Sequence, residues 1–338
     1  MKKIFVRSPY FIEVNEAGQI GSKVELFIWN KGTTEPTTPT YTLSKKIPSE
    51  VQTNTAYNIS NYAKEFIKIV NPVSVIVPTQ ESNNAWCYIK VKRYKETTSN
   101  TYTLLDTETF VCLNGYTDYN GGYNNYNDDN VVLLANEDIK LTHNKYVNVW
   151  LFGGVGTSDY VWSPNGADTD ITVTESGLYK LPVSYSNINS LRQGSTVYFN
   201  IVSNQICEPK YTPITCTFVN RFGGWQYLTF FKANTQSIDV TSKDFNLLPS
   251  AINYNVLQGQ KKQFNQQGKQ KIKCNTGWVD ENYSELIQDL LLSEVVLLDN
   301  KSVIVKSQSA DIKTHLKDKN INYEIEFEYN YGLINDVI

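Results

Sequence analysis

The sequence predicts a mainly all-β protein made of tandem immunoglobulin-like β-sandwich domains, with one or two short helices. Short segments in which apolar and polar residues alternate recur along the 338 residues. Stretches rich in Thr, Pro, Asn and Gly separate these segments, and aromatic residues make up 13% of the chain. Alternation with a period of two places one face of a strand in a core and the other in water. Many short strands separated by turns are typical of a sandwich.

The first predicted domain covers residues 1–135. Its alternating segments predict strands at residues 2–6, 19–29, 73–77 and 86–94. A short helix is expected at 58–67, with Ser60 or Asn61 as its N-cap.

Residues 114–130 form the longest segment without an aliphatic side chain. Asn and Gly tolerate positive φ, so we expect a long loop or a loose hairpin. Its tyrosines suit stacking on sugars, whereas the simpler interpretation is a polar surface loop. Its carboxylates are oxygen ligands that suit calcium, although the spacing of an EF-hand is absent. The candidate interaction residues here are Tyr116, Tyr119, Tyr123 and Tyr126.

Two further domains are predicted, at 136–207 and 208–338. Strands are expected at residues 147–152, 194–202, 211–220, 225–231 and 321–330, with a turn at 221–224. The one strongly amphipathic helix is expected at 282–292, where Ser284 is a suitable N-cap.

The last domain carries two oppositely charged segments. The first, at 258–273, contains Lys261, Lys262, Lys269, Lys271 and Lys273. The second lies on the last strand, where Glu324, Glu326 and Glu328 alternate with apolar residues, so one face is expected to be buried and the other acidic. Either the two segments pair head to tail between copies of the chain, or they pair within one domain, or they do not pair.

The motifs of catalysis are missing from the sequence. No GxSxG motif is present, and only His143 and His315 are available as imidazole bases. The five cysteines are scattered without the close spacing of a zinc site. The glycine-rich turn at 153–156 precedes no helix, so it does not fit a phosphate-binding loop. The three glutamates resemble a solvated strand face more than the pair of carboxylates with separated pKa values that a glycosidase needs. We therefore expect no enzyme, no cofactor and no metal.

Charge and hydropathy exclude further classes. The formal net charge is −3, which argues against a protein that binds nucleic acid through a basic face. No run of about 18 apolar residues occurs, so no membrane-spanning helix is expected. An odd, dispersed set of cysteines is typical of reduced thiols in a protein made in a cytosol.

Several segments together form a recognisable pattern, namely residues 7–12 (RSPYFI), 24–29 (VELFIW), 41–45 (YTLSK), 57–67 (YNISNYAKEFI), 207–225, and the final helix and strands with ELIQDLLLS, VIV and YEIEFEY. These segments resemble virion structural proteins of tailed phages that infect Bacteroidetes, including crAss-like phages. They are spread over most of the chain and are fold-forming patterns without catalytic residues.

The resemblance implies a non-enzymatic tail protein located in the virion and made in the cytoplasm of the host bacterium. Copies would form a ring or adaptor at the portal–tail axis, or a platform for fibre attachment. The expected partners are further copies of the chain and other tail, portal or fibre proteins. The alternative is a receptor- or carbohydrate-binding protein of a tail or fibre.

Overall fold

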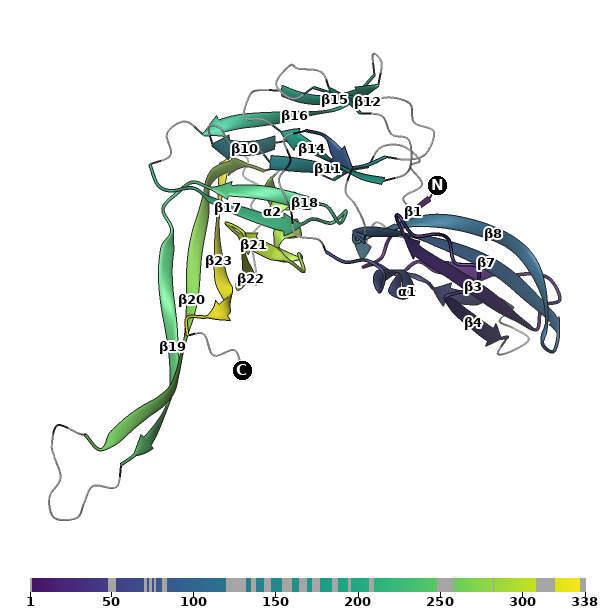
Figure 1. Cartoon of the computed structure of the whole chain (residues 1–338), viewed down its shortest axis with the longest axis horizontal. Coiled ribbons are helices and arrows are strands. Elements are labelled where there is room, and N and C mark those ends of the chain that lie inside the picture. Colours follow the sequence, from purple (N-terminus) through teal and green to yellow (C-terminus); the bar gives the residue numbers. More distant parts are fainter. Residues whose placement is uncertain are drawn as a thin grey trace. The chain divides into compact units, whose positions relative to one another are not determined.

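The computed structural model confirms a mainly all-β, sandwich-like protein (Figure 1). It describes residues 2–47, 53–69, 72, 75, 77–80, 84–119, 132–134, 138–142, 147–153, 160–163, 169–171, 177–183, 188–193, 196–206, 210–247, 257, 259–281, 283–307 and 320–334. The chain divides into two compact units. The first contains residues 1–207 and 219–226, and the second contains 208–218 and 227–338.

The N-terminal part of the first unit pairs a five-stranded sheet with a two-stranded one. The larger sheet has the order β1 (Lys2–Phe5), β8 (Thr101–Leu113), β7 (Trp86–Thr98), β3 (Gly21–Asn30) and β4 (Tyr41–Lys46). The smaller one pairs β2 (Phe11–Val14) with β5 (Thr55–Asn58). Alternate residues of β3, namely Val24, Leu26 and Ile28, are buried in a common core with residues of β2 and β5. The strands predicted at 2–6, 19–29 and 86–94 are therefore confirmed.

Two local predictions in this part need correction. The helix α1 is only Ser60–Lys64, and its N-cap is Ile59, which makes no capping hydrogen bond through its side chain. The side chain that caps the first turn is that of Asn58, whose Oδ1 accepts the Ser60 N–H at 3.2 Å. A strand was also expected at 73–77, but the two described residues of that segment, Val75 and Val77, lie outside strands.

The rest of the first unit contains two further sheets. One has the order β10 (Asp138–Thr142), β16 (Thr196–Ile206), β15 (Ile188–Gln193), β12 (Tyr160–Ser163) and β13 (Thr169–Ile171). The other has the order β6 (Thr79–Gln80), β14 (Gly177–Val183), β11 (Val147–Gly153) and β9 (Val132–Leu134). The ring of Trp86 on β7 meets Phe152 on β11 edge to face at 5.4 Å. The division of this unit near residue 135 stays a prediction.

The second unit contains one seven-stranded sheet and a helix. The order is β18 (Trp225–Phe230), β17 (Ile214–Val219), β21 (Val296–Leu298), β22 (Lys301–Val305), β23 (Asn320–Gly332), β20 (Lys261–Asp280) and β19 (Thr235–Asn246). The helix α2 (Tyr283–Leu291) packs Leu286, Ile287 and Leu290 into the core of this sheet. Ser284, expected as the cap, lies inside the helix.

The turn between β17 and β18 packs within the first unit, beside the end of β8. The carbonyl of Arg221 accepts the Tyr116 N–H at 2.7 Å, and the ring of Phe222 lies 6.0 Å from that of Phe5. Gly223 has φ of +88°, and a Cβ there would lie 2.7 Å from the Asn114 carbonyl carbon. Only glycine fits both the conformation and the space.

Replacing Gly223 with alanine therefore tests this contact. Gly223→Ala should lower the free energy of unfolding by about 2–4 kcal/mol, because it adds a steric clash to the strain of a positive φ. Gly18→Ala is the matched control, since Gly18 has φ of +73° with nothing within 4 Å of its Cβ position. Urea unfolding should show a cost of about 1 kcal/mol for the control. Equal costs would mean that the turn does not pack against Asn114.

The core of the second unit centres on Phe327, which is completely buried on β23 and meets Phe230 edge to face at 5.8 Å. Phe327→Ala should destabilise the protein by about 3–5 kcal/mol, as truncation of a core aromatic does. Ile304→Ala on the neighbouring strand β22 is the control, because Ile304 is exposed. A loss below about 1 kcal/mol for Phe327→Ala would contradict the assigned inner face of β23.

Candidate functional site

The charged residues of β20 and β23 form a ladder of ion pairs within the second unit. These strands are antiparallel neighbours, with Lys273 opposite Glu326 in the register. Three lysines on β20 each contact a glutamate on β23: Lys269–Glu328 at 3.3 Å, Lys271–Glu326 at 3.8 Å and Lys273–Glu324 at 2.9 Å. Of the alternatives that the sequence left open, pairing within one domain is the one that the structure contains.

Glu328 departs from the expected solvated acidic face. Its side chain is only 8% exposed, and its carboxylate lies 3.3 Å from the amines of both Lys269 and Lys306. Burial raises the pKa of Glu328, but hydrogen bonds and charges of Lys306 and Lys269 outweigh burial and leave the pKa below its ordinary value. The carboxylate is therefore held ionised and fully engaged, which does not suit a general acid.

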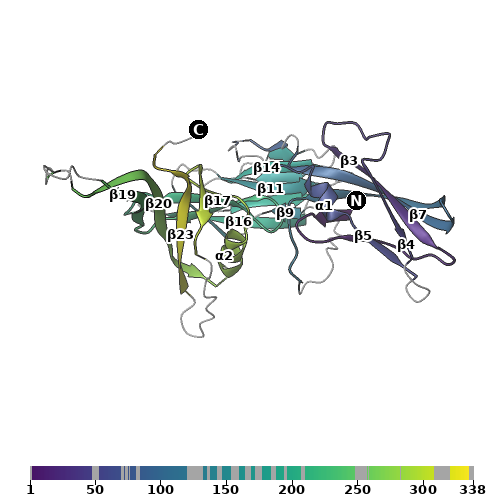
Figure 2. The ribbon, with the colours of Figure 1, turned by 90° about the horizontal axis from the view of Figure 1, so that it is seen from below.

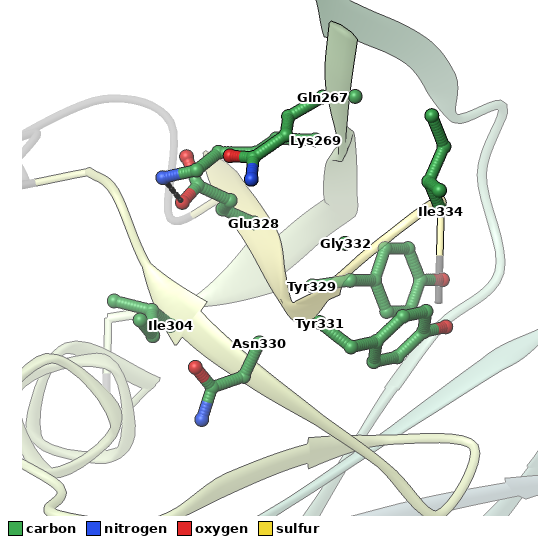
Figure 3. Close-up of a pocket in the computed structure, with 10 residues that line it drawn as sticks. Gln267, Lys269, Ile304, Glu328, Tyr329, Asn330, Tyr331, Gly332 and Ile334 are labelled. Carbon is green, nitrogen blue, oxygen red and sulfur yellow. Dashed lines mark hydrogen bonds and ion pairs between the residues drawn. The ribbon is translucent and has the colours of Figure 1, made fainter. Parts of the chain in front are cut away.

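A cavity of about 290 Å³ lies beside Glu328, where β23 ends against β20 (Figure 3). The rings of Tyr329 and Tyr331 lie side by side there, with centroids 5.4 Å apart. The side chain of Leu333 packs against Gly268, whose carbonyl accepts the Leu333 N–H at 2.9 Å. The lining combines the two tyrosine rings and Ile304 with polar groups of Gln267, Lys269, Glu328 and Asn330, so it offers both aromatic surface and hydrogen-bonding groups.

The strands β19 and β20 form the edge of the sheet and continue past the core as a ribbon, here called the arm, which comprises residues 237–246 and 261–271 (Figures 1 and 2). All twelve residues of β19 are exposed, including Ile238 at 58% and Val240 at 65%. Near its far end, the rings of Phe245 and Phe264 meet at 5.6 Å. A ribbon of two strands with apolar residues exposed on it gains little from its own packing.

Four of the candidate lysines, Lys261, Lys262, Lys269 and Lys271, lie on the strand β20 of the arm. The sequence predicted no strand within the basic segment 258–273, whereas residues 261–273 form the first part of β20. Lys261 contacts Asp244 at 3.3 Å, and Lys262 lies opposite Phe245. The sequence analysis did not predict β19, although the alternation of Ile238 and Val240 with polar residues was a strand signal.

The described tyrosines of the segment 114–130 differ in their surroundings. Tyr116 is half-buried, with its ring 4.9 Å from the guanidinium of Arg7 and its N–H bonded to Arg221. Tyr119 is fully exposed. Tyr123 and Tyr126 lie outside the described residues, as do His143 and His315.

The described part of the chain contains no group of three His, Cys, Asp or Glu side chains placed to hold a metal ion. Among the same residues, no helix has the length and apolar character needed to cross a bilayer. Cys87, Cys112, Cys216 and Cys274 are buried free thiols. Burial raises the pKa of Cys112 and Cys216 well above its ordinary value, so these thiols are poor nucleophiles.

Comparison with models of known protein families and with curated protein sequences finds no match. The arm and the adjoining cavity are therefore interpreted from their own geometry.

The buried carboxylate of Glu328 gives a test of the ladder. Glu328→Gln should lower the free energy of unfolding at pH 7 by about 1–3 kcal/mol, because two lysines lose their charged acceptor. Folding lowers the pKa of Glu328. The stability that its carboxylate adds is therefore complete above the pKa of the unfolded chain, about 4.3, and disappears as pH falls through the lower pKa of the folded chain. The deficit measured by urea unfolding should therefore shrink below about pH 4.

Glu324→Gln is the control, because its side chain is 52% exposed and contacts only Lys273 among the described ion pairs. Its cost should stay below about 1 kcal/mol. If both variants cost the same at pH 7, the greater burial of Glu328 has no energetic consequence.

Proposed function

We propose that this chain is a non-enzymatic structural protein of a phage tail. Copies would form a ring or adaptor at the portal–tail axis or a platform for fibres, together with portal, tail or fibre proteins. The protein would be made in the cytoplasm of a host bacterium and then reside in the virion. The arm would be the contact through which a copy is incorporated.

The observation that carries this proposal is the arm of the second unit. Exposed edge strands are normally short, charged or covered, because their free N–H and C=O groups invite pairing. The edge strand β19 is long and is covered by no other described strand, and its twelve exposed residues include Ile238 and Val240. Pairing of such an edge with another chain is a common mode of protein recognition. The segments that resemble phage virion proteins point to the same kind of assembly.

A second candidate function is binding of a receptor or carbohydrate by a tail or fibre protein. It is favoured by the full exposure of Tyr119 and by Trp278, whose side chain is 66% exposed on β20. Exposed aromatic rings are suited to stacking on sugars. Retention on host polysaccharide that is lost in Tyr119→Ala or Trp278→Ala would favour this candidate over assembly.

The location is tested first by immunogold labelling of intact virions with an antibody against the chain. Label along the tail axis or collar is the expected result, whereas label at distal tips would favour receptor binding. Particles in which mass spectrometry finds no trace of the chain would overturn both functions.

The role of the arm is tested by a variant in which residues 242–264 are replaced by a short glycine-containing turn. The shortened chain should melt at the wild-type temperature, because the core clusters around β23 and α2 contain no residue of that segment. It should nevertheless be missing from particles when the variant is supplied in place of the wild type. Incorporation at the wild-type level would show that the arm is not an assembly contact.

A further inference from the structure

The outer edge of β19 is regular along its whole length. β19 pairs with β20 on one side, and no described strand pairs with its other side. The ladder between them is irregular after Thr241, where β19 advances two residues to Lys243 while β20 advances three, from Gln267 to Phe264. The extra residue therefore belongs to β20, where Asn265 takes a positive φ of 51°. The free edge thus keeps the period-two alternation that a further strand needs.

The charges along this edge have a symmetrical arrangement. Asp239 and Lys243 lie four residues apart in the strand, so they share a face and lie equally far on either side of Thr241. Asp239 also pairs with Lys271 at 2.5 Å. Lys243 has no ion pair among the described residues, although it is one of the few charged groups along the edge.

From this arrangement we propose that β19 pairs antiparallel with β19 of a second copy, with the two Thr241 residues opposite each other. This inference rests on the proposed function, because it names the partner of the arm. In this register Asp239 lies opposite Lys243 of the second copy, and symmetry forms the pair twice. Opposite charges across an antiparallel pair are stabilising, whereas like charges are destabilising.

Charge complementarity selects this register over its neighbours. A two-fold axis perpendicular to the sheet requires that a residue face its own counterpart at the centre. Centring the ladder on Asp239 or on Lys243 would place identical charges opposite each other. Centring it on Val240 or Ser242 would leave Asp239 opposite an uncharged residue. Only the register centred on Thr241 pairs Asp239 with Lys243.

The residues on the opposite face of β19 are also compatible with this pairing. The two Val240 side chains, both largely exposed in the single chain, become diagonal neighbours within reach of each other. Ile238 faces Asp244 of the second copy, whose charge already pairs with Lys261 of its own chain. The contact joins copies in pairs, so a tail ring would repeat the pair as its unit.

Charge reversal provides the first experiment. The purified full-length chain should dimerise in sedimentation equilibrium, and Asp239→Lys or Lys243→Asp alone should weaken the dimer by about tenfold or more. An equimolar mixture of the two single variants should restore dimerisation, because every facing pair then becomes attractive. The double variant Asp239→Lys/Lys243→Asp should also dimerise. A mixture as weak as its components would overturn the register.

Crosslinking provides the second experiment and is independent of charge. Thr241→Cys should form a disulfide-linked dimer under mild oxidation, because directly opposed residues lie within the span of a disulfide. Ser237→Cys is the control on the same exposed face, since its two copies would be about 27 Å apart over eight strand steps. Equal crosslinking of both variants, or of neither, would overturn the proposal.

These outcomes separate the inference from the proposed function. Absence of the chain from virions alongside specific crosslinking at Thr241→Cys would refute the tail function and leave the pairing intact. Arm-dependent incorporation into particles without crosslinking would refute the second copy as partner and leave the tail function intact.

Discussion

The second unit depends on the pairing of one strand, β20, along both of its edges. Of its twenty residues, 261–273 pair with β19 on one side and 269–280 pair with β23 on the other. One part of β20 contributes Ile272 and Cys274 to the core, and the other part extends into the exposed arm. The core therefore anchors a ribbon that has too little buried surface to be stable alone.

Charge reinforces this anchoring at the place where the core ends. Lys269, Lys271 and Lys273 meet three glutamates of β23 on one face, while Ile272 and Phe327 lie opposite each other on the other face. Exposed pairs of this kind contribute little individually. Glu328 is different because it is buried between two lysines, so losing its charge would leave both without an acceptor. The ladder thus favours the observed register over one shifted by a residue, which would turn every charge towards the core.

The first unit shows a different way of holding distant segments together. The turn at 220–224 packs against residues 114–116 through backbone hydrogen bonds and a glycine that leaves no room for a side chain. Asn220 supports the turn, since its Oδ1 accepts the N–H groups of Phe222 and Gly224, each at 3.1 Å. Precise packing of a turn therefore orients the beginning of the tyrosine-rich segment, where Tyr116 is held and Tyr119 is exposed.

The sequence by itself determined the all-β class, most of the described strands and the apolar face of α2, because side-chain alternation and helical periodicity are local properties. It could not decide between a wet acidic face and an ion-pair ladder, since Glu324, Glu326 and Glu328 alternate identically in either case. Only the tertiary structure placed β20 beside β23 and buried Glu328. Likewise, the mostly polar segment 261–267 is exposed and was not predicted as a strand, although its pairing with β19 makes it one. Long-range pairing decides such segments, and a local pattern contains no information about the partner.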